Sequence, residues 1–299
     1  LKGRYNIGNW AWELPDFPDI WQGSFKPLDE VWAVSDFTRD SIAAKSPIPV
    51  CTLPHSVQME KSEEDFTRED LGLPEDVFLF LVMYDTRSAA ARKNPQGAVK
   101  AFLKAFAGDN RAALLIKVNA PDDWDEEDGF LQSLVVYSNV YTIKQTFTRG
   151  GTNRLLELSD AYLSLHRSEG FGLCACGARV LGRTVGQSNW SDDTQNKWRD
   201  KWCLVGNKMM EITEDSGWYT KGGNGAGPDM NDAAAQMKRL VDEPAWCKAI
   251  AEAGQRTIKE EFSPAATGAI LRGRLQELGL LDEETRAEEE EPAAGEEKE

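Results

Sequence analysis

The segment SLHRSEGFGL, residues 164–173, places one acid, Glu169, between an apolar run and a Gly-Phe-Gly turn. An ionised carboxylate accepts strong hydrogen bonds from sugar hydroxyls. Glycines allow the backbone to approach a ligand closely, and the backbone amides that begin a following helix suit a phosphate. The segment therefore indicates binding of sugar hydroxyls and phosphate. The alternative is that Glu169 caps a helix beside an ordinary turn.

The elements around this segment alternate between strand and helix patterns. AYLSLH (161–166) predicts a strand and GLCACGARVLG (172–182) a helix. Upstream, VFLFLVMYD (77–85) and AALLIKVN (112–119) predict buried strands, and NPQGAVKAFLKAFAG (94–108) predicts the helix between them. This alternation predicts an α/β fold with a Rossmann-like, doubly wound parallel sheet. Such sheets bind ligands at the carboxyl ends of their strands, where Glu169 is expected.

Two flanking regions complete the expected organisation. VWAVSDFTRDSIAAK (31–45) predicts a buried strand, a cap at Ser35 or Asp36, and a helix. The prolines of SPIPVCTLPHSV (46–57) favour extended backbone, so a short strand within an interdomain hinge is expected. Residues 202–230 are expected to be rich in loops, and their glycines do not form a dinucleotide-binding GxGxxG motif.

Four stretches together resemble the group 1 (family 4) branch of the GT-B glycosyltransferases. They cover roughly residues 1–280 in the family's order: NIGNWAWELPDFPDIW with DEVWAVSDFTRDSI and PVCTLPHSV, then SAAARKNPQGAVKAFLKAF, SLHRSEGFGL, and EEFSPAATGAILRGRLQELG. The resemblance implies a carboxyl-terminal domain that holds a nucleoside-diphosphate sugar without an obligatory metal. It also implies transfer of the sugar to a hydroxyl with retention of configuration.

The resemblance also implies a set of donor-site residues. Lys93 and Arg92 would neutralise the leaving diphosphate, which is the main electrostatic task of the reaction; the alternative is an exposed basic helix start. Glu169 would hold hydroxyls of the transferred sugar. The remaining donor-binding candidates are the amides of Gly170, Phe171 and Gly172, the side chains of His166 and Arg167, and Ser88, which stands where many relatives carry an arginine. A histidine at a strand end is more often structural.

The sequence departs from the family pattern at one expected contact. The family usually carries a second glutamate eight positions after the first, which grips the nucleotide ribose, and this chain has Gly177 there. On the acceptor side, Trp10, Trp12 and Glu13 are candidates, because aromatic faces stack on sugar rings and a carboxylate takes a hydroxyl proton; packing explains them equally well. Asp192 and Asp193 are interpreted as solvated, and the alternative is that they accept hydrogen bonds from sugar hydroxyls.

We expect three regions: 1–54, a remnant of the amino-terminal, acceptor-side domain with the hinge; 55–281, the nucleotide-sugar-binding domain with its closing helix; and 282–299, a disordered acidic tail. The tail holds ten acidic and two basic residues, so its charge of −8 is half of the total of −16. Most of the amino-terminal domain is expected to be missing from this sequence.

Composition limits the partners. The mildly acidic body lacks basic clusters, which argues against nucleic-acid binding. Five cysteines without paired CxxC spacing, and only two histidines, predict reduced thiols in a cytoplasmic setting and no metal site. No apolar run is long enough to span a membrane, which leaves peripheral membrane contact open.

The functional prediction is a retaining glycosyltransferase whose acceptor is a glycan, a lipid or a small molecule. The alternatives are a truncated or degenerate family member that binds a nucleotide sugar or a partner protein without catalysis, and an interaction protein marked by its acidic tail.

Overall fold

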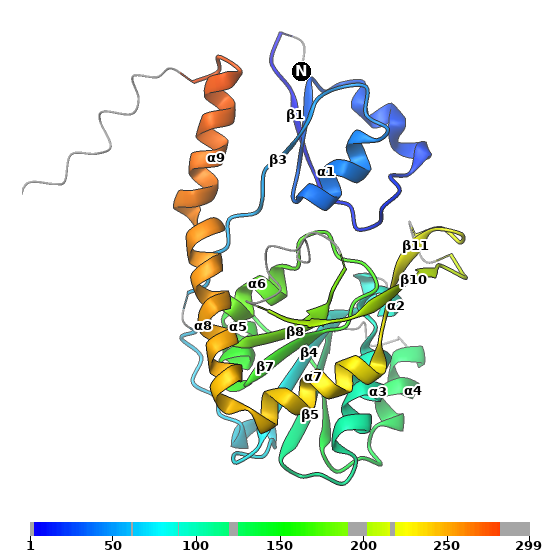
Figure 1. Ribbon diagram of the computed structural model, residues 1–299, viewed down its shortest axis with the longest axis vertical. Helices are drawn as coiled ribbons and strands as arrows, with labels where there is room; N and C mark the ends of the chain where they lie inside the picture. Colours follow the sequence, from blue (N-terminus) through cyan, green and yellow to red (C-terminus); the bar gives the residue numbers. More distant parts are fainter. Residues whose placement is uncertain are drawn as a thin grey trace, which may run out of the picture.

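The computed structural model contains a sheet of six parallel strands in the order β6-β5-β4-β7-β8-β9 (Figure 1). The strands are β4 (Phe78–Asp85), β5 (Ala112–Asn119), β6 (Val140–Lys144), β7 (Ala161–Ser164), β8 (Thr184–Ser188) and β9 (Cys203–Val205). The strand order runs outward in both directions from the neighbours β4 and β7. Their carboxyl ends therefore flank a topological switch point, the place where open α/β sheets bind ligands.

The structure describes residues 3–60, 62–88, 90–119, 125–190, 202–215 and 219–281. The predicted acidic tail and the pair Asp192 and Asp193 lie outside these residues.

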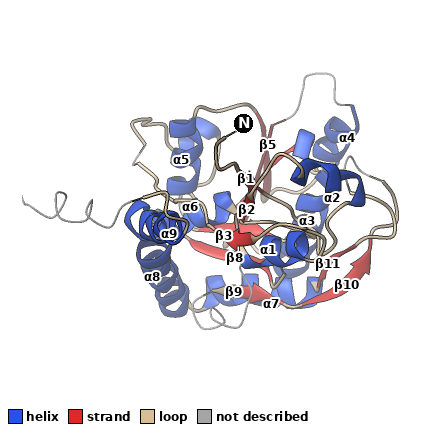
Figure 2. Cartoon of the chain, turned by 90° about the horizontal axis from the view of Figure 1, so that it is seen from above, coloured by secondary structure: helices blue, strands red, loops and turns tan. Residues whose placement is uncertain are grey.

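Helices cover both faces of the larger sheet. Alternate β4 residues such as Phe80 pack with α3 (Pro95–Phe106), α4 (Asp125–Ser133) and α7 (Met230–Asp242), and their neighbours such as Leu81 pack with α5 (Arg149–Leu158) and α6 (Leu173–Val180). Figure 2 shows α5 and α6 on the opposite side of the strands from α3 and α4. Because side chains alternate across a strand, burial on both faces explains the continuous apolar runs. The predicted doubly wound sheet is confirmed.

A smaller parallel sheet has the order β1-β2-β3, made of β1 (Ile7–Trp10), β2 (Glu30–Ala33) and β3 (Val50–Thr52). One face packs against α1 (Asp36–Ala43) and an aromatic cluster that includes the short 3-10 helix η1 (Asp19–Phe25). Ser35 caps α1 by accepting a hydrogen bond from the Thr38 amide at 3.2 Å. The predicted strand, cap and helix of residues 31–45 are confirmed.

The expectation of a loop-rich region at 202–230 is wrong in part. Besides β9, it contains an antiparallel hairpin of β10 (Asn207–Glu211) and β11 (Asn224–Pro228), which extends toward the smaller sheet in Figure 1. The sequences NKMME and NGAGP have weak strand propensity, so tertiary contacts form these strands. A Cβ atom on Gly225 would lie 3.1 Å from the carbonyl oxygen of Arg167, so glycine allows β11 to lie against the loop between β7 and α6.

Five more helices lie among the described residues. The short helices η2 (Glu69–Leu71), η3 (Thr86–Ser88) and α2 (Ala90–Lys93) flank β4, and α8 (Pro244–Glu261) contacts α6 and α7. The last helix, α9 (Pro264–Glu277), continues from α8 and lies level with the smaller sheet in Figure 1.

A buried ion pair ties α9 to the smaller sheet. Arg274 donates from Nε to Glu30 Oε1 at 2.9 Å and from Nη2 to Oε2 at 2.7 Å. Glu30 is fully buried, and its carboxylate also accepts from Trp32 Nε1 and the Tyr5 hydroxyl. Burial opposes ionisation, but the hydrogen bonds from Arg274, Trp32, Cys51 and Tyr5 outweigh it and hold the pKa of Glu30 at about 2.

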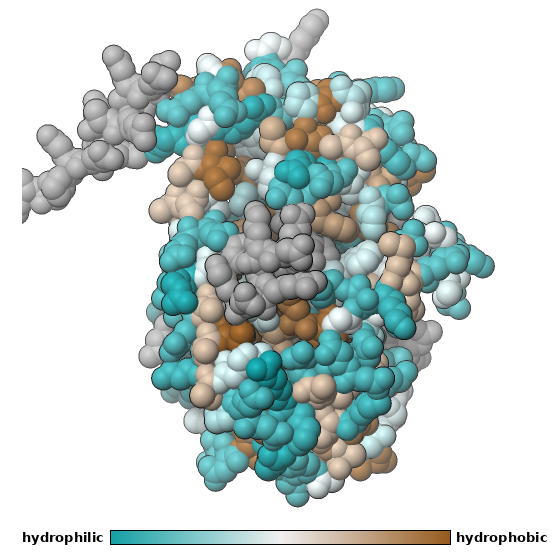
Figure 3. All heavy atoms as spheres, in the orientation of Figure 1, coloured by the Kyte–Doolittle hydropathy of each residue, from teal (hydrophilic) through white to brown (hydrophobic). Residues whose placement is uncertain are grey.

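The surface offers scattered apolar side chains. On the face shown in Figure 3, apolar residues lie in separate groups between hydrophilic ones. Within the described ranges, none of the helices combines the length and the apolar character that crossing a membrane requires.

We expect Arg274→Met to lower the free energy of unfolding by about 3 kcal/mol, because it leaves the buried Glu30 carboxylate without its cation. Urea unfolding measures this. The matched control is Glu277→Gln, which removes the exposed partner of the same arginine and should cost less than about 1 kcal/mol. Equal losses of unfolding free energy in the two variants would show that burial of Glu30 does not strengthen its ion pair with Arg274.

Candidate active site

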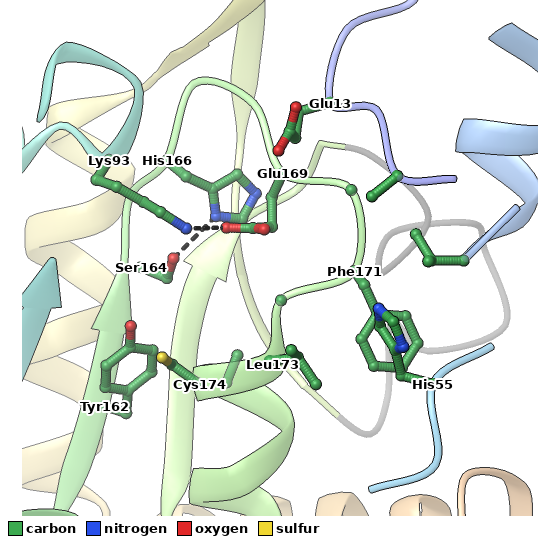
Figure 4. A pocket seen from close by; sticks show the side chains of 15 residues that line it. Glu13, His55, Lys93, Tyr162, Ser164, His166, Glu169, Phe171, Leu173 and Cys174 are labelled. Carbon is green, nitrogen blue, oxygen red and sulfur yellow. Dashed lines mark hydrogen bonds and ion pairs between the residues drawn. The ribbon is translucent and has the colours of Figure 1, made fainter. Parts of the chain in front are cut away.

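A cavity of about 250 Å³ lies at the carboxyl end of β7, beside the switch point of the larger sheet (Figure 4). Three of its residues belong to the smaller-sheet part of the chain: Ala11, Glu13 and Val34. The hinge contributes His55, α2 contributes Lys93, and the rest come from β7, the loop after it and the first turn of α6: Tyr162, Ser164, His166, Glu169, Gly170, Phe171, Gly172, Leu173, Cys174 and Ala175. Both sheets therefore supply walls of one site.

The loop that carries Glu169 is fixed by four hydrogen bonds from three segments of the chain, around residues 92–94, 188 and 226. The carbonyl oxygens of residues 165, 166, 167 and 168 accept, in this order, from Asn94 Nδ2 (2.8 Å), Ser188 Oγ (2.7 Å), the Ala226 amide (2.6 Å) and Arg92 Nη1 (3.0 Å). Four consecutive tertiary hydrogen bonds leave the loop little freedom. Glu169 is therefore preorganised at the cavity rather than ordered by a ligand.

Glu169 forms an ion pair with Lys93, whose Nζ donates to Glu169 Oε2 (Figure 4). Arg92 Nη1 lies 3.5 Å from the same oxygen. Burial opposes ionisation of Glu169, but the charges of Lys93 and Arg92 outweigh it and hold its pKa at about 2. Glu169 is thus an ionised hydrogen-bond acceptor at neutral pH.

The two predicted cations differ in what they contact. Lys93 lines the cavity, whereas the buried Arg92 does not. Besides its bond to the Ser168 carbonyl, the Arg92 guanidinium donates from Nη2 to Ser88 Oγ at 2.7 Å. Ser88 therefore contacts Arg92 rather than the cavity. The geometry gives Arg92 a supporting position behind Glu169.

His166 and Arg167 also differ in whether they line the cavity. The His166 ring lines the cavity, with Nδ1 2.9 Å from Ser164 Oγ and Nε2 3.4 Å from the Trp190 carbonyl oxygen. Burial lowers the pKa of His166 to about 4, so the ring is neutral at pH 7. The side chain of Arg167 is exposed and is not part of the lining, and its backbone carries the contacts to Arg92 and Ala226.

The residues Gly170, Phe171 and Gly172 all line the cavity, but packing already explains their types. A Cβ atom on Gly170 would lie 2.9 Å from the Trp12 carbonyl oxygen, so glycine lets the loops of the two sheets meet. Gly172 has φ of 79° at the start of α6, a conformation that favours glycine. The Phe171 ring packs edge-on against His55, with ring centres 5.1 Å apart.

Of the three acceptor-side candidates, Glu13 alone lines the cavity. Trp12 is buried and stacks on Tyr219, with ring centres 5.8 Å apart, and Trp10 packs against Phe25. The aromatic faces that were predicted to meet a sugar therefore lie in the core of the smaller sheet. Glu13 extends from this core into the cleft, above Glu169 in Figure 4.

The sequence predictions did not include the lining residues Tyr162, Ser164 and Cys174. Alternation along β7 could have identified Tyr162 and Ser164, and Cys174 lies in the first turn of α6, directly after the Gly-Phe-Gly turn. Tyr219 contacts the lining residue Glu13, since its hydroxyl donates to Glu13 Oε2 at 2.9 Å, and it could not have been identified because the hairpin that carries it was not predicted.

Gly177 packs against the side chain of Met59, two residues after the hinge. A Cβ atom at this position would lie 3.1 Å from Met59 Cε and 3.3 Å from its sulfur. Position 177, where the resemblance predicts a ribose-binding glutamate, is therefore in contact with the thioether of Met59. A longer side chain there requires Met59 to move.

A scan of the sequence against models of protein families finds no match, and a search of curated protein sequences also finds none. Solved structures do match. Sucrose-phosphate synthase from Thermosynechococcus elongatus superposes with a TM-score of 0.63 at 16% identity, over 87% of this chain and 61% of that one. TarM superposes with a TM-score of 0.64 at 15% identity, over 92% of this chain and 50% of that one. The pneumococcal O-GlcNAc transferase GtfA, in complex with UDP and GlcNAc, superposes with a TM-score of 0.61 at 14% identity, over 92% and 52%.

These structures are GT-B glycosyltransferases. The chain has the GT-B fold. It spans about three fifths of the length of the synthase and half that of TarM. The chain contains both Rossmann-like sheets of this fold, which confirms the expected architecture. Loops from the two sheets meet at the Glu169 cavity.

Metal ligands are not grouped in the described part of the GT-B fold: no three His, Cys, Asp or Glu side chains there are placed to hold one ion. Lys93 supplies a positive charge to the wall of the cavity.

We expect stability to fall between pH 6.5 and pH 4 because of His166. Its pKa is lowered in the folded state, so the unfolded chain takes up its proton first as the pH falls. The stabilisation is present above pH 6.5 and its loss amounts to about 3 kcal/mol. Urea unfolding across this range should show a shallower pH dependence for His166→Gln than for the unchanged protein. An unaltered slope would assign the acid sensitivity to other groups.

Gly170→Ala tests the contact between the two sheets. We expect a loss of about 1–3 kcal/mol, because the new methyl group meets the Trp12 carbonyl and the backbone has to shift. Gly268→Ala is the matched control, since its Cβ meets open space within α9 and helix propensity predicts a gain of about 0.5–1 kcal/mol. Thermal unfolding compares the two, and a neutral Gly170→Ala would mean that the loops separate freely.

Proposed function

We propose that the chain is a glycosyltransferase that moves a sugar from a nucleoside-diphosphate donor to a hydroxyl acceptor, with retention of configuration. The observation that carries the proposal is the Glu169–Lys93 pair at a switch-point cavity built by both sheets of a GT-B fold. GtfA was solved with UDP and GlcNAc bound, which supports a nucleotide-sugar donor of this kind.

Glu169 and Lys93 bind different parts of the donor in this proposal. Glu169 is ionised and accepts hydrogen bonds from hydroxyls of the transferred sugar. Lys93 is the cation that turns from Glu169 to the diphosphate, where negative charge grows as the bond to the sugar breaks. The amides at the start of α6, after Gly172, add partial positive charge. Arg92 keeps the Glu169 loop in place through the Ser168 carbonyl.

The acceptor lies on the smaller-sheet side of the cavity, where Glu13 is the ionisable residue in the lining. The proposed acceptors are hydroxyls of a glycan, a lipid or a small molecule. Because Lys93 and the helix amides supply positive charge, donor binding is proposed to need no obligatory metal.

Glu169→Ala is expected to reduce transfer at least about tenfold while folding remains intact, because hydrogen bonds to a charged group contribute roughly 1.5–3 kcal/mol. Lys93→Met should weaken UDP binding in calorimetry with EDTA present. Product formation from a panel of UDP- and GDP-sugars measures transfer. Glu157→Ala is the matched control, since Glu157 pairs with Arg154 at similar burial but outside the cavity. Unchanged kinetics in Glu169→Ala would remove this acid from the mechanism.

A second candidate function is binding of a nucleotide sugar, or of a partner protein, without turnover. The contact of Met59 with Gly177 favours it, because this position offers no acid to the ribose. The same two measurements separate the candidates: calorimetric binding of a UDP- or GDP-sugar without any product supports the second and contradicts the first.

A further inference from the structure

The β10–β11 hairpin places one aromatic side chain between the two halves of the site. Tyr219, which precedes β11, stacks on Trp12 with ring centres 5.8 Å apart and planes 15° from parallel. Its hydroxyl donates to Glu13 Oε2 at 2.9 Å. On the other side, Arg92 Cζ lies 5.9 Å from the centre of the ring. A single residue thus touches the acid of the smaller sheet and the cation that supports Glu169.

The hairpin is held firmly on both sides. The Ala226 amide donates to the Arg167 carbonyl at 2.6 Å, within the loop that carries Glu169. Ile212, at the other end of the hairpin, packs with Tyr219 against the aromatic cluster of the smaller sheet. The amide of Ile212 and the carbonyl of Gly223 close the hairpin at 2.7 Å. Tyr219 is therefore presented to Glu13 by backbone that is anchored to both sheets.

We propose that Tyr219 is a positioning residue for the acceptor. It holds Glu13 in the cleft so that the Glu13 carboxylate accepts a hydrogen bond, and then the proton, from the attacking hydroxyl. This inference rests on the proposed function. The Tyr219 hydroxyl engages Oε2 of Glu13, and we assign Oε1 to the acceptor hydroxyl.

Tyr219 suits this task chemically. Burial raises the pKa of Tyr219 well above its ordinary value, so the phenol keeps its proton and remains a donor at neutral pH. A phenol that donates to one carboxylate oxygen restricts rotation of the carboxylate, and stacking on Trp12 restricts the phenol in turn. The pair gives Glu13 one orientation toward the cavity, which it lines.

The transfer step balances as follows. In keeping with retention of configuration, the oxygen of the acceptor hydroxyl bonds to the anomeric carbon on the face from which the diphosphate departs, and its proton passes to Glu13. The bond between the anomeric carbon and the diphosphate oxygen breaks, and its electron pair leaves on the diphosphate beside Lys93. Donor binding does not involve Glu13 in this scheme, so changes at Tyr219 act on the acceptor and on turnover.

A double-mutant cycle of Tyr219→Phe and Glu13→Gln tests the inference. UDP or GDP release from the donor panel is followed with methyl glucoside and glycerol as hydroxyl acceptors, and donor affinity is measured by calorimetry. Tyr219→Phe keeps the stacked ring, and we expect transfer to fall about tenfold, the loss of one hydrogen bond to a charged group. Glu13→Gln should cost about a hundredfold. The double variant should match Glu13→Gln, with donor affinity unchanged in all three.

The controls separate positioning from a general effect. Tyr5→Phe removes another tyrosine–glutamate hydrogen bond, to Glu30 at 3.0 Å, far along the chain from the cavity loop, and should leave transfer unchanged. Tyr219→His restores an N–H donor on a ring and should recover part of the rate lost in Tyr219→Phe. If the phenylalanine chain does not fold, Tyr219→Leu, which also lacks the donor, replaces it in the cycle.

Two results would overturn the inference alone: an active protein in which Tyr219→Phe is as fast as the unchanged chain, or a double variant whose loss is the product of the two single losses. Turnover absent from the unchanged protein would overturn the proposed function and this inference with it.

Discussion

The arrangement of the site depends on the loop between β7 and α6, whose four successive carbonyls accept hydrogen bonds from Asn94, Ser188, Ala226 and Arg92. Parallel strands end at a common edge, so side chains and backbone from separate segments of the chain converge there. Arg92 and Asn94 lie in one segment, and Ser188 and Ala226 come from two others. The acid at the end of this loop is consequently held by the whole larger domain rather than by its own local turn.

Charge within the cavity is balanced before any ligand arrives. Glu169 is nearly buried, and it remains ionised because Lys93 and Arg92 offset the cost of its desolvation. The two cations are not equivalent, since Arg92 is occupied by backbone and hydroxyl acceptors while Lys93 lines the cavity. In the proposed reaction, Lys93 exchanges Glu169 for the anionic diphosphate, while Arg92 continues to support the loop.

Among the described residues, several contacts join the larger domain to the smaller sheet and its loops. Gly170 meets the Trp12 carbonyl, Tyr219 reaches from the hairpin to Glu13, and Arg274 of α9 pairs with Glu30 on the far face of the smaller sheet. The cavity lies beside the first two of these contacts. Its shape therefore depends on how the sheets are joined as well as on the residues that line it.

The sequence by itself determined the alternating strands and helices, because the apolar runs of β4 and β5 and the capped starts of α1 and α3 are local signals. It also located Glu169 at a strand end and Lys93 at the start of a helix pair. The tertiary structure alone decided which candidates face the cavity. Trp12 lies in the core, Arg92 donates to the Ser168 carbonyl, and Tyr219 contacts Glu13, which is 206 positions away in the sequence. Such contacts arise when distant segments pack together, and no local pattern of residues encodes them.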